Sequence, residues 1–130
     1  MALPRGLAPN QAQHATIAAS RGSLVAAVLR NIESQGWIVE ESDSTSGTVV
    51  AVTPFEADSN LITRERWIFS IGDQDVAVQL FLEAADATDP ADVVSWRSYD
   101  VVCAGYSYSR ERTQLASIAA HPEASLALNP

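Results

Sequence analysis

Side chains that could carry out chemistry are few in this sequence and stand far apart. His14 and His121 lie near opposite ends of the chain, and neither has a second metal ligand at a suitable spacing. Cys103 is the only cysteine, and no local motif supplies a base that would make it a nucleophile. The sequence contains no G-x-S-x-G motif, P-loop or dinucleotide fingerprint. We therefore expect no catalytic, cofactor-binding or metal-ligating residues, and a protein that is not an enzyme.

Three aspartates at intervals of three form a candidate cation site. Asp86, Asp89 and Asp92 supply the oxygen ligands that Ca²⁺ and Mg²⁺ prefer. The series lacks the EF-hand pattern, however. The stretch from Asp89 to Asp92 resembles a helix start, with Asp89 as the N-cap and Pro90 in the first turn. Helix capping is therefore the interpretation that we prefer.

Two short segments place arginine beside aromatic side chains. Residues 64–66 (Arg-Glu-Arg) precede Trp67, and residues 110–112, of the same composition, follow Tyr108. Arginine and aromatic residues are enriched in protein interfaces, although surface charges beside core aromatics give the same pattern. We expect Trp37 and Trp67 to pack between helix and sheet, and an exposed tryptophan would mark a binding groove. The candidate interaction surface consists of Trp37, Arg64, Arg66, Trp67, Trp96, Tyr106 and Tyr108.

The charge balance narrows the class of partner. The 130 residues include 16 acidic side chains against eight arginines, which gives a formal net charge of −8. Nucleic acids and anionic membranes attract basic surfaces, so neither is expected as the main partner. No apolar run approaches the ~20 residues that span a bilayer, so we expect no direct membrane insertion by this segment. A protein partner is expected, and formation of a homo-oligomer stays open.

The length suggests a single domain. We place it at residues 15–121, after a flexible lead-in at 1–14 and before a loose tail at 122–130.

A helix is predicted at residues 23–35, where apolar side chains recur on one face of a 3.6-residue turn. Ser20 or Ser23 can cap its start, and Gly36 can end it in a left-handed conformation. The face expected to be buried contains Leu24, Val25, Val28, Leu29 and Ile32.

Two β-hairpins are predicted after this helix. The first joins residues 37–41 to residues 48–53. The second joins residues 61–71 to residues 76–83, whose apolar and polar side chains alternate. The predicted fold is α+β: an antiparallel sheet of about four strands packed against an N-terminal helix and a C-terminal helix.

The segment before the C-terminal helix is ambiguous. A helix that begins at Asp89 would carry Trp96 and Tyr106 on one side, but residues 99–108 are rich in Tyr and Val and also fit a strand. Both interpretations stay open, and a second helical piece is predicted at 109–120.

Residues 23–53 resemble the helix-grip modules of BamC-like and other small bacterial envelope lipoproteins. The shared features are a helix that ends in Gly and an aromatic residue, a strand, a D-x-x-x-G turn and a valine-rich strand. The matching residues are Val28, Leu29, Ile32, Gly36, Trp37, Val39, Asp43, Gly47, Val49 and Val52. The resemblance implies a helix-grip-like, non-catalytic module that serves as an assembly or interaction surface. The chain shows no lipidation cysteine near its start and no paired module, so a lipid anchor would require a removed leader.

We therefore expect a non-enzymatic protein-interaction or assembly domain of a bacterial cell-envelope protein, on the periplasmic side. A cytoplasmic location stays open. One alternative is a small acidic chaperone of the secretion type, although such proteins usually place a helix between their strands. Another is a helix-grip domain that binds a small ligand, which would need a large dry pocket lined by Trp67, Phe69, Leu80 and Phe81.

Overall fold

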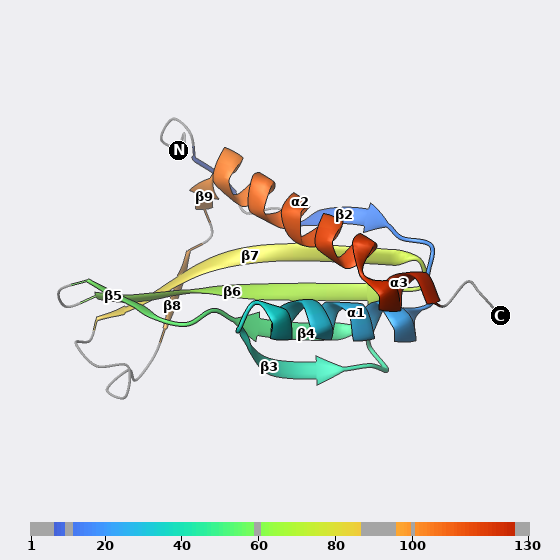
Figure 1. Cartoon of the computed structure of the whole chain (residues 1–130). Helices are drawn as coiled ribbons and strands as arrows, with labels where there is room; N and C mark the ends of the chain where they lie inside the picture. The colour runs from blue at the N-terminus through green and yellow to red at the C-terminus, as the bar shows by residue number, and fades with distance from the viewer. Residues whose placement is uncertain (1–6, 10–11, 59–60, 87–95, 100, 127–130) are drawn as a thin grey trace.

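The computed structural model describes residues 7–9, 12–58, 61–86, 96–99 and 101–126. In this part of the chain an antiparallel sheet lies against helices on one face, so the architecture is α+β (Figure 1). The helices are α1 (Arg21–Ser34), α2 (Ala104–Ala120) and α3 (Pro122–Leu126).

A long hairpin forms the centre of the sheet. Strands β6 (Leu61–Gly72) and β7 (Asp75–Asp86) pair along their whole length through a tight turn. Their apolar side chains alternate with polar ones, as a strand with two different faces requires. This hairpin and the hairpin of β3 and β4 confirm the two predicted from the sequence.

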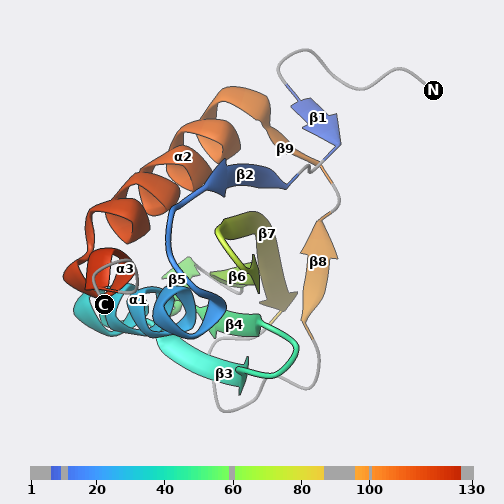
Figure 2. The same cartoon turned by 90° about the vertical axis from the view of Figure 1, so that its right-hand side faces the viewer.

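Short strands flank the hairpin on both sides. The sheet runs in the order β2-β7-β6-β4-β3, while β5 also pairs with β6 and β8 also pairs with β7. These strands are β2 (Gln13–Thr16), β3 (Ile38–Asp43), β4 (Thr48–Val52), β5 (Glu56–Asp58) and β8 (Arg97–Tyr99). A separate two-stranded ribbon joins β1 (Leu7–Pro9) to β9 (Val101–Cys103), and Figure 2 shows it beside the N-terminal end of α2.

Helix α1 begins two residues before the predicted range of 23–35 and ends one residue before its end. Ser20 is the N-cap, and its hydroxyl accepts a hydrogen bond from the Ser23 N–H. Asp73, in the turn between β6 and β7, accepts a further bond from the Arg21 N–H at 3.0 Å. Gly36 adopts a φ of 75°, the left-handed conformation that ends the helix.

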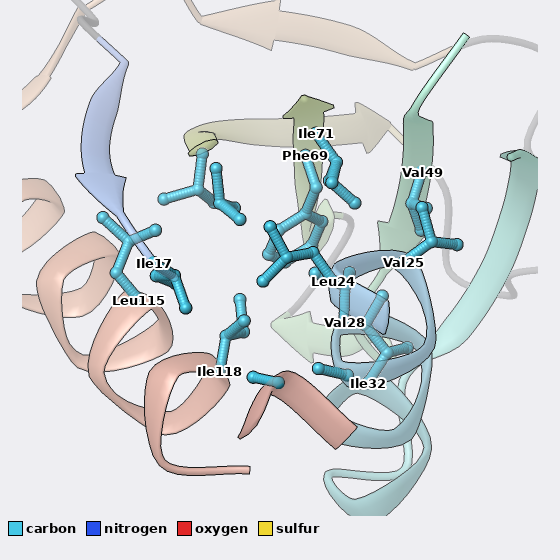
Figure 3. Close-up of a cluster of buried hydrophobic side chains, with 14 of the residues drawn as sticks. Ile17, Leu24, Val25, Val28, Ile32, Val49, Phe69, Ile71, Leu115 and Ile118 are labelled. Carbon is cyan, nitrogen blue, oxygen red and sulfur yellow. The ribbon is translucent and has the colours of Figure 1, made fainter. Parts of the chain in front are cut away.

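The core lies between the helices and one face of the sheet. In Figure 3 side chains from α1 and from the C-terminal helices point toward Phe69, Ile71 and Val49 of the sheet. Its buried side chains include Leu24, Val25, Val28, Ile32, Trp67, Val76, Val78, Leu80, Leu115 and Ile118. Four of the five residues predicted for the inner face of α1 are buried, and the fifth, Leu29, packs partly buried against them.

The strand count corrects the sequence prediction of about four strands, because seven described strands form the main sheet. The additional strands β2, β5 and β8 contain only three or four residues each. Such strands are too short to show an alternating pattern. Their pairing is determined by the long β6–β7 hairpin beside them.

The two ends of the chain also differ from expectation. Strand β1 and the first half of β2 lie within residues 1–14, which the sequence suggested to be a flexible lead-in. A short helix, α3, occupies the start of the predicted loose tail. A continuous helix through Trp96 and Tyr106 is wrong, since β8 and β9 occupy this region and α2 begins only at Ala104. The proposed helix start at Asp89 lies outside the described residues.

Candidate functional site

A cleft of about 420 Å³ lies where the β6–β7 hairpin extends past the helices. Figure 1 shows the β5 and β8 end of the sheet reaching beyond both α1 and α2. The cleft is lined by Thr53, Pro54, Phe55 and Glu56 from the connection between β4 and β5, by Thr63, Arg64 and Glu65 of β6, by Leu82 of β7 and by Arg110 of α2. It therefore brings together four separate parts of the chain.

Each edge of the hairpin has a break in its strand pairing near this cleft. On the β6 edge, β4 ends at Val52 and β5 begins at Glu56. Between them the Thr53 hydroxyl accepts a bond from the Glu65 N–H at 2.9 Å, and the Thr53 N–H donates to the Glu65 carbonyl at 3.0 Å. The hydroxyl and the N–H of Thr53 thus continue the hydrogen bonding along β6 in the segment between β4 and β5, which forms the cleft wall.

The break on the β7 edge is closed by a carboxylate. Strand β2 pairs with β7 only as far as Val78, and β8 resumes the pairing at Leu82. Glu111 of α2 is only 1% exposed, and its carboxylate accepts a bond from the Leu80 N–H at 2.9 Å. A buried N–H left without an acceptor is costly, so Glu111 stabilises the interrupted edge.

An ion pair occupies the floor of the cleft. The carboxylate of Glu65 pairs with the guanidinium of Arg110, and it also accepts a hydrogen bond from Trp67 Nε1 at 3.3 Å. The same guanidinium lies 5.4 Å from the centre of the Trp67 ring, within the range of a cation–π contact. Burial lowers the pKa of Arg110, and the nearby carboxylate of Glu56 opposes this shift. Several contacts therefore fix the positions of the polar side chains that form the floor of the cleft.

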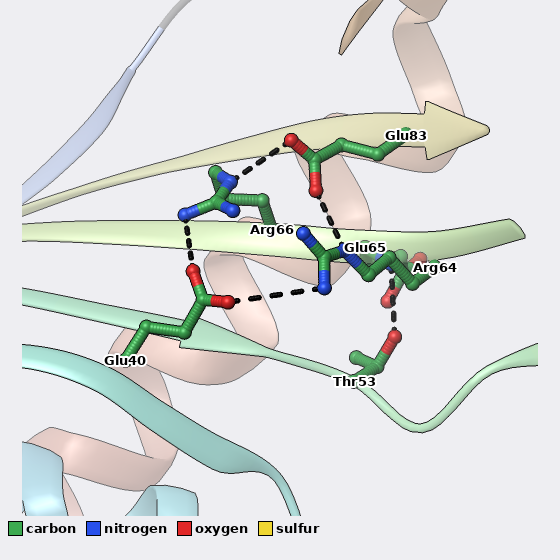
Figure 4. A network of polar contacts seen from close by, with 6 residues as sticks. All are labelled: Glu40, Thr53, Arg64, Glu65, Arg66 and Glu83. Carbon is green, nitrogen blue, oxygen red and sulfur yellow. Dashed lines mark hydrogen bonds and ion pairs between the residues drawn. The ribbon is translucent and has the colours of Figure 1, made fainter. Parts of the chain in front are cut away.

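A second ionic network lies on the opposite face of the sheet (Figure 4). Glu83 bridges Arg64 and Arg66 at 2.8 and 2.9 Å, and Glu40 approaches the same two guanidiniums at 3.8 and 2.6 Å. The side chains of Arg64 and Glu83 are each only 8% exposed. Burial opposes the charge of Arg66, but its bonds to Glu83 and Glu40 outweigh that effect and raise its pKa. This closed set of pairs joins three strands and is a structural feature.

Aromatic stacking connects this network to the cleft wall. The Arg64 guanidinium lies 4.0 Å from the centre of the Trp96 ring, and Trp96 stacks in turn on Phe55 with 5.5 Å between ring centres. Phe55 is held from one side by this stack and stays 44% exposed. Its orientation at the cleft is thus determined by residues from β6 and from the segment before β8.

The structure distributes the residues predicted as an interaction surface over several places. Trp67 is fully buried in the core, and Arg64 is buried in the ionic network, so neither is available to a partner as it stands. Trp37 is partly buried and stacks on Trp67 with 5.1 Å between ring centres, as expected for a residue between helix and sheet. Arg66 and Trp96 are partly buried and belong to the network and the stack, and Tyr108 is exposed on α2. The side chain of Tyr106 lies outside the described residues.

Sequence reasoning missed most of the cleft. Glu65 and Arg110 belong to the two Arg-Glu-Arg segments, which gave a signal, but the members that meet are one carboxylate and one arginine from different segments. Phe55 and Leu82 gave no local signal, because their proximity depends on the pairing of β5 and β8.

Both histidines considered at the outset contact neighbouring groups of the fold. His14 lies 2.9 Å from Asp75, and His121 Nδ1 accepts a bond from the Glu123 N–H at the start of α3. Asp89 and Asp92 lie outside the described residues. Within the described ranges, no three His, Cys, Asp or Glu side chains are grouped so that they could hold a metal ion. Those ranges also contain no helix with the length and apolar character needed to cross a membrane.

Comparison with known proteins identifies similar structures but no family. No family model matches the sequence, and no curated protein matches it. A DUF4468 family protein from Bacteroides ovatus is 9% identical, with a TM-score of 0.54 over 88% of this chain and 87% of that one. This likeness shows the fold. A TBP-like protein from Parabacteroides distasonis is 14% identical, with a TM-score of 0.46 over 76% of this chain and 69% of that one.

Proposed function

We propose that this chain is a non-enzymatic protein-interaction domain that docks its partner in the cleft beside Arg110. The observation that supports this function best is the exposure of two large apolar side chains at one polar cleft, Phe55 at 44% and Leu82 at 40%. Interface centres combine such apolar anchors with arginine and a polar rim. The contacts of Glu65 and Arg110 with Trp67 hold the floor in place, which reduces the entropy lost on binding.

A small ligand is the second candidate occupant. The cleft volume falls within the range of about 300–1,000 Å³ that is typical of ligand pockets. The position differs from the helix-grip pocket considered above, because Trp67, Phe69 and Leu80 fill the core and Phe81 belongs to the other face of the sheet. Mass spectrometry of the native protein purified from its source would separate the candidates, since a retained small molecule would add a discrete mass.

The proposed location is the bacterial cell envelope, with attachment through a lipid on a longer precursor. This proposal rests on the resemblance of residues 23–53 to envelope lipoprotein modules. Growth of the source organism with labelled fatty acid tests it, because label on the natural gene product in a membrane fraction is the expected result. An unlabelled product found only in the cytosol would contradict the envelope location without affecting the docking site.

Native complex size tests the docking function. In extracts of the source organism, the tagged wild-type protein should migrate as a complex larger than the purified chain alone. Leu82→Glu should release the chain from that complex, because a charge would enter the apolar part of the cleft. Ser117→Glu, on the exposed side of α2, is the matched control and should leave the complex intact. Thermal melting confirms that both variants fold. A wild-type chain that migrates alone, or a complex unaffected by Leu82→Glu, would contradict the proposal.

A further inference from the structure

The charges of the cleft indicate what kind of segment fits it. Glu56 and Glu65 line the cleft, and both carboxylates act on the single guanidinium of Arg110. The other lining arginine, Arg64, is bound to Glu83 and Glu40 on the opposite face, and its side chain is only 8% exposed. Among the described lining residues, two carboxylates around one guanidinium leave a net negative charge in the cleft.

The position of Glu56 makes this charge accessible. Glu56 is exposed at the first residue of β5, directly after Phe55. Leu82 lines the same cleft from β7. A cationic side chain that meets Glu56 would therefore lie on the face of the sheet that carries Leu82, and an apolar neighbour could pack against Leu82. Lysine and arginine suit this site, because their methylene groups cover apolar surface while the charged end reaches a carboxylate.

From this arrangement we infer that the occupant is a partner segment in which a lysine or arginine stands next to an apolar residue. The inference rests on the proposed docking function and specifies the chemistry of its partner. The net charge of −8 acts in the same direction, since a negative protein accelerates association with a basic partner. A second copy of this chain is disfavoured as the occupant, because it would carry the same negative charge to the site.

Matched peptides test the inference on the whole chain. The probes are blocked pentapeptides Gly-Phe-X-Val-Gly, in which X is lysine, norleucine or glutamate, and binding is followed by the backbone amide signals of ¹⁵N-labelled protein. The lysine peptide should shift the signals of Glu56, Thr63 and Leu82. It should bind about fivefold more tightly than the norleucine peptide and about tenfold more tightly than the glutamate peptide at low salt. High salt should reduce these ratios.

Two variants with the same net charge distinguish an effect of the cleft carboxylate from an effect of the overall charge of the protein. Glu56→Gln should remove most of the preference for lysine over norleucine, whereas Glu41→Gln, an exposed carboxylate on β3, should keep it. Equal losses in the two variants would overturn the inference, because the preference would then reflect net charge alone.

The outcomes separate this inference from the function on which it rests. Equal affinity of the three peptides, with shifts confined to the cleft, would overturn the basic segment while leaving the cleft as a docking site. No shift of any cleft signal by any peptide would overturn both. Shifts of the same signals on concentrating the protein alone would identify a second copy as the occupant and would also overturn the inference.

Discussion

Gly47 occupies the most restrictive backbone position in the described chain. Its φ is 78°, a region that residues with a side chain enter at a cost, and a Cβ there would overlap the carbonyl oxygen of Ile71. The Gly47 carbonyl also accepts a bond from the Ile71 N–H at 2.7 Å. The turn between β3 and β4 is thus held directly against the β6 strand.

A series of three glycine substitutions separates the two costs at this turn. Gly47→Ala should lower the free energy of unfolding by about 3 kcal/mol, through backbone strain and overlap together. Gly36→Ala, with a φ of 75° and open space around it, should cost only about 1 kcal/mol. Gly22→Ala in α1 should be neutral or stabilise by up to about 1 kcal/mol. Urea denaturation measures all three, and equal losses for Gly47→Ala and Gly36→Ala would contradict the overlap.

Asp43 gives the same turn a dependence on pH. The N–H groups of Ser46 and Thr45 donate to its carboxylate, and these bonds lower its pKa below the usual value of 3.8. A lowered pKa in the folded state means that the carboxylate stabilises the fold at pH values above 3.8 and that this contribution disappears as the pH falls through the folded value.

The Tm difference between the wild type and Asp43→Ala should therefore be constant near neutral pH and should shrink below pH 3.8. Calorimetric scans across this range measure it. Asp73→Ala removes a different exposed aspartate that caps α1, and it controls for the general effect of acid. A Tm difference for Asp43→Ala that grows as the pH falls would show that the sign is wrong.

Among the strands, Glu83 joins β6 and β7 through two arginines that it contacts on the outer face. Removing one partner of a buried ion pair leaves an unpaired charge in a poorly solvated place. Glu83→Gln should therefore lower the free energy of unfolding by about 3 kcal/mol. Glu33→Gln, in the exposed pair with Arg30 at 3.3 Å, should change it by less than about 0.5 kcal/mol. Chemical denaturation of both variants checks the contrast, and similar small effects would mean that the network contributes little.

The break in the β7 edge predicts a local effect of Glu111. Glu111→Ala should increase the exchange rate of the Leu80 amide about tenfold more than Glu111→Gln does, because glutamine keeps an oxygen that can accept the bond. Hydrogen exchange followed by NMR measures this rate against that of the Val78 amide, which belongs to the paired region with β2. Equal Leu80 exchange in both variants would show that the carboxylate does not cap the edge.

Sequence patterns predicted the elements whose signal is local. The helix from Arg21 to Ser34 has its periodicity, its serine cap and its terminal glycine, and the two main hairpins have alternating strands. Strands β2, β5 and β8 exist because the long hairpin offers them an edge, which is a long-range cause. The cleft depends on those same strands, so its apolar members Phe55 and Leu82 could not be identified from their neighbours in sequence.

At the scale of the whole molecule, the helices cover one part of the long hairpin and leave the other part open. The covered part contains the filled core, and the open part contains the cleft. In the proposed function, stability and binding therefore depend on different parts of one continuous hairpin. Substitutions in the core should act on folding, whereas changes at Leu82 should act on association.

Site-specific crosslinking in the source organism tests the central claim most directly. A photoreactive amino acid replaces Leu82 in the cleft or Ser117 on the exposed side of α2, and adducts are resolved by size after irradiation. A docking cleft predicts a discrete protein adduct from position 82 that is absent from position 117 and is reduced by Glu56→Gln in the same chain. Adducts of equal yield from both positions, or none from position 82 while the folded protein is present, would contradict the claim.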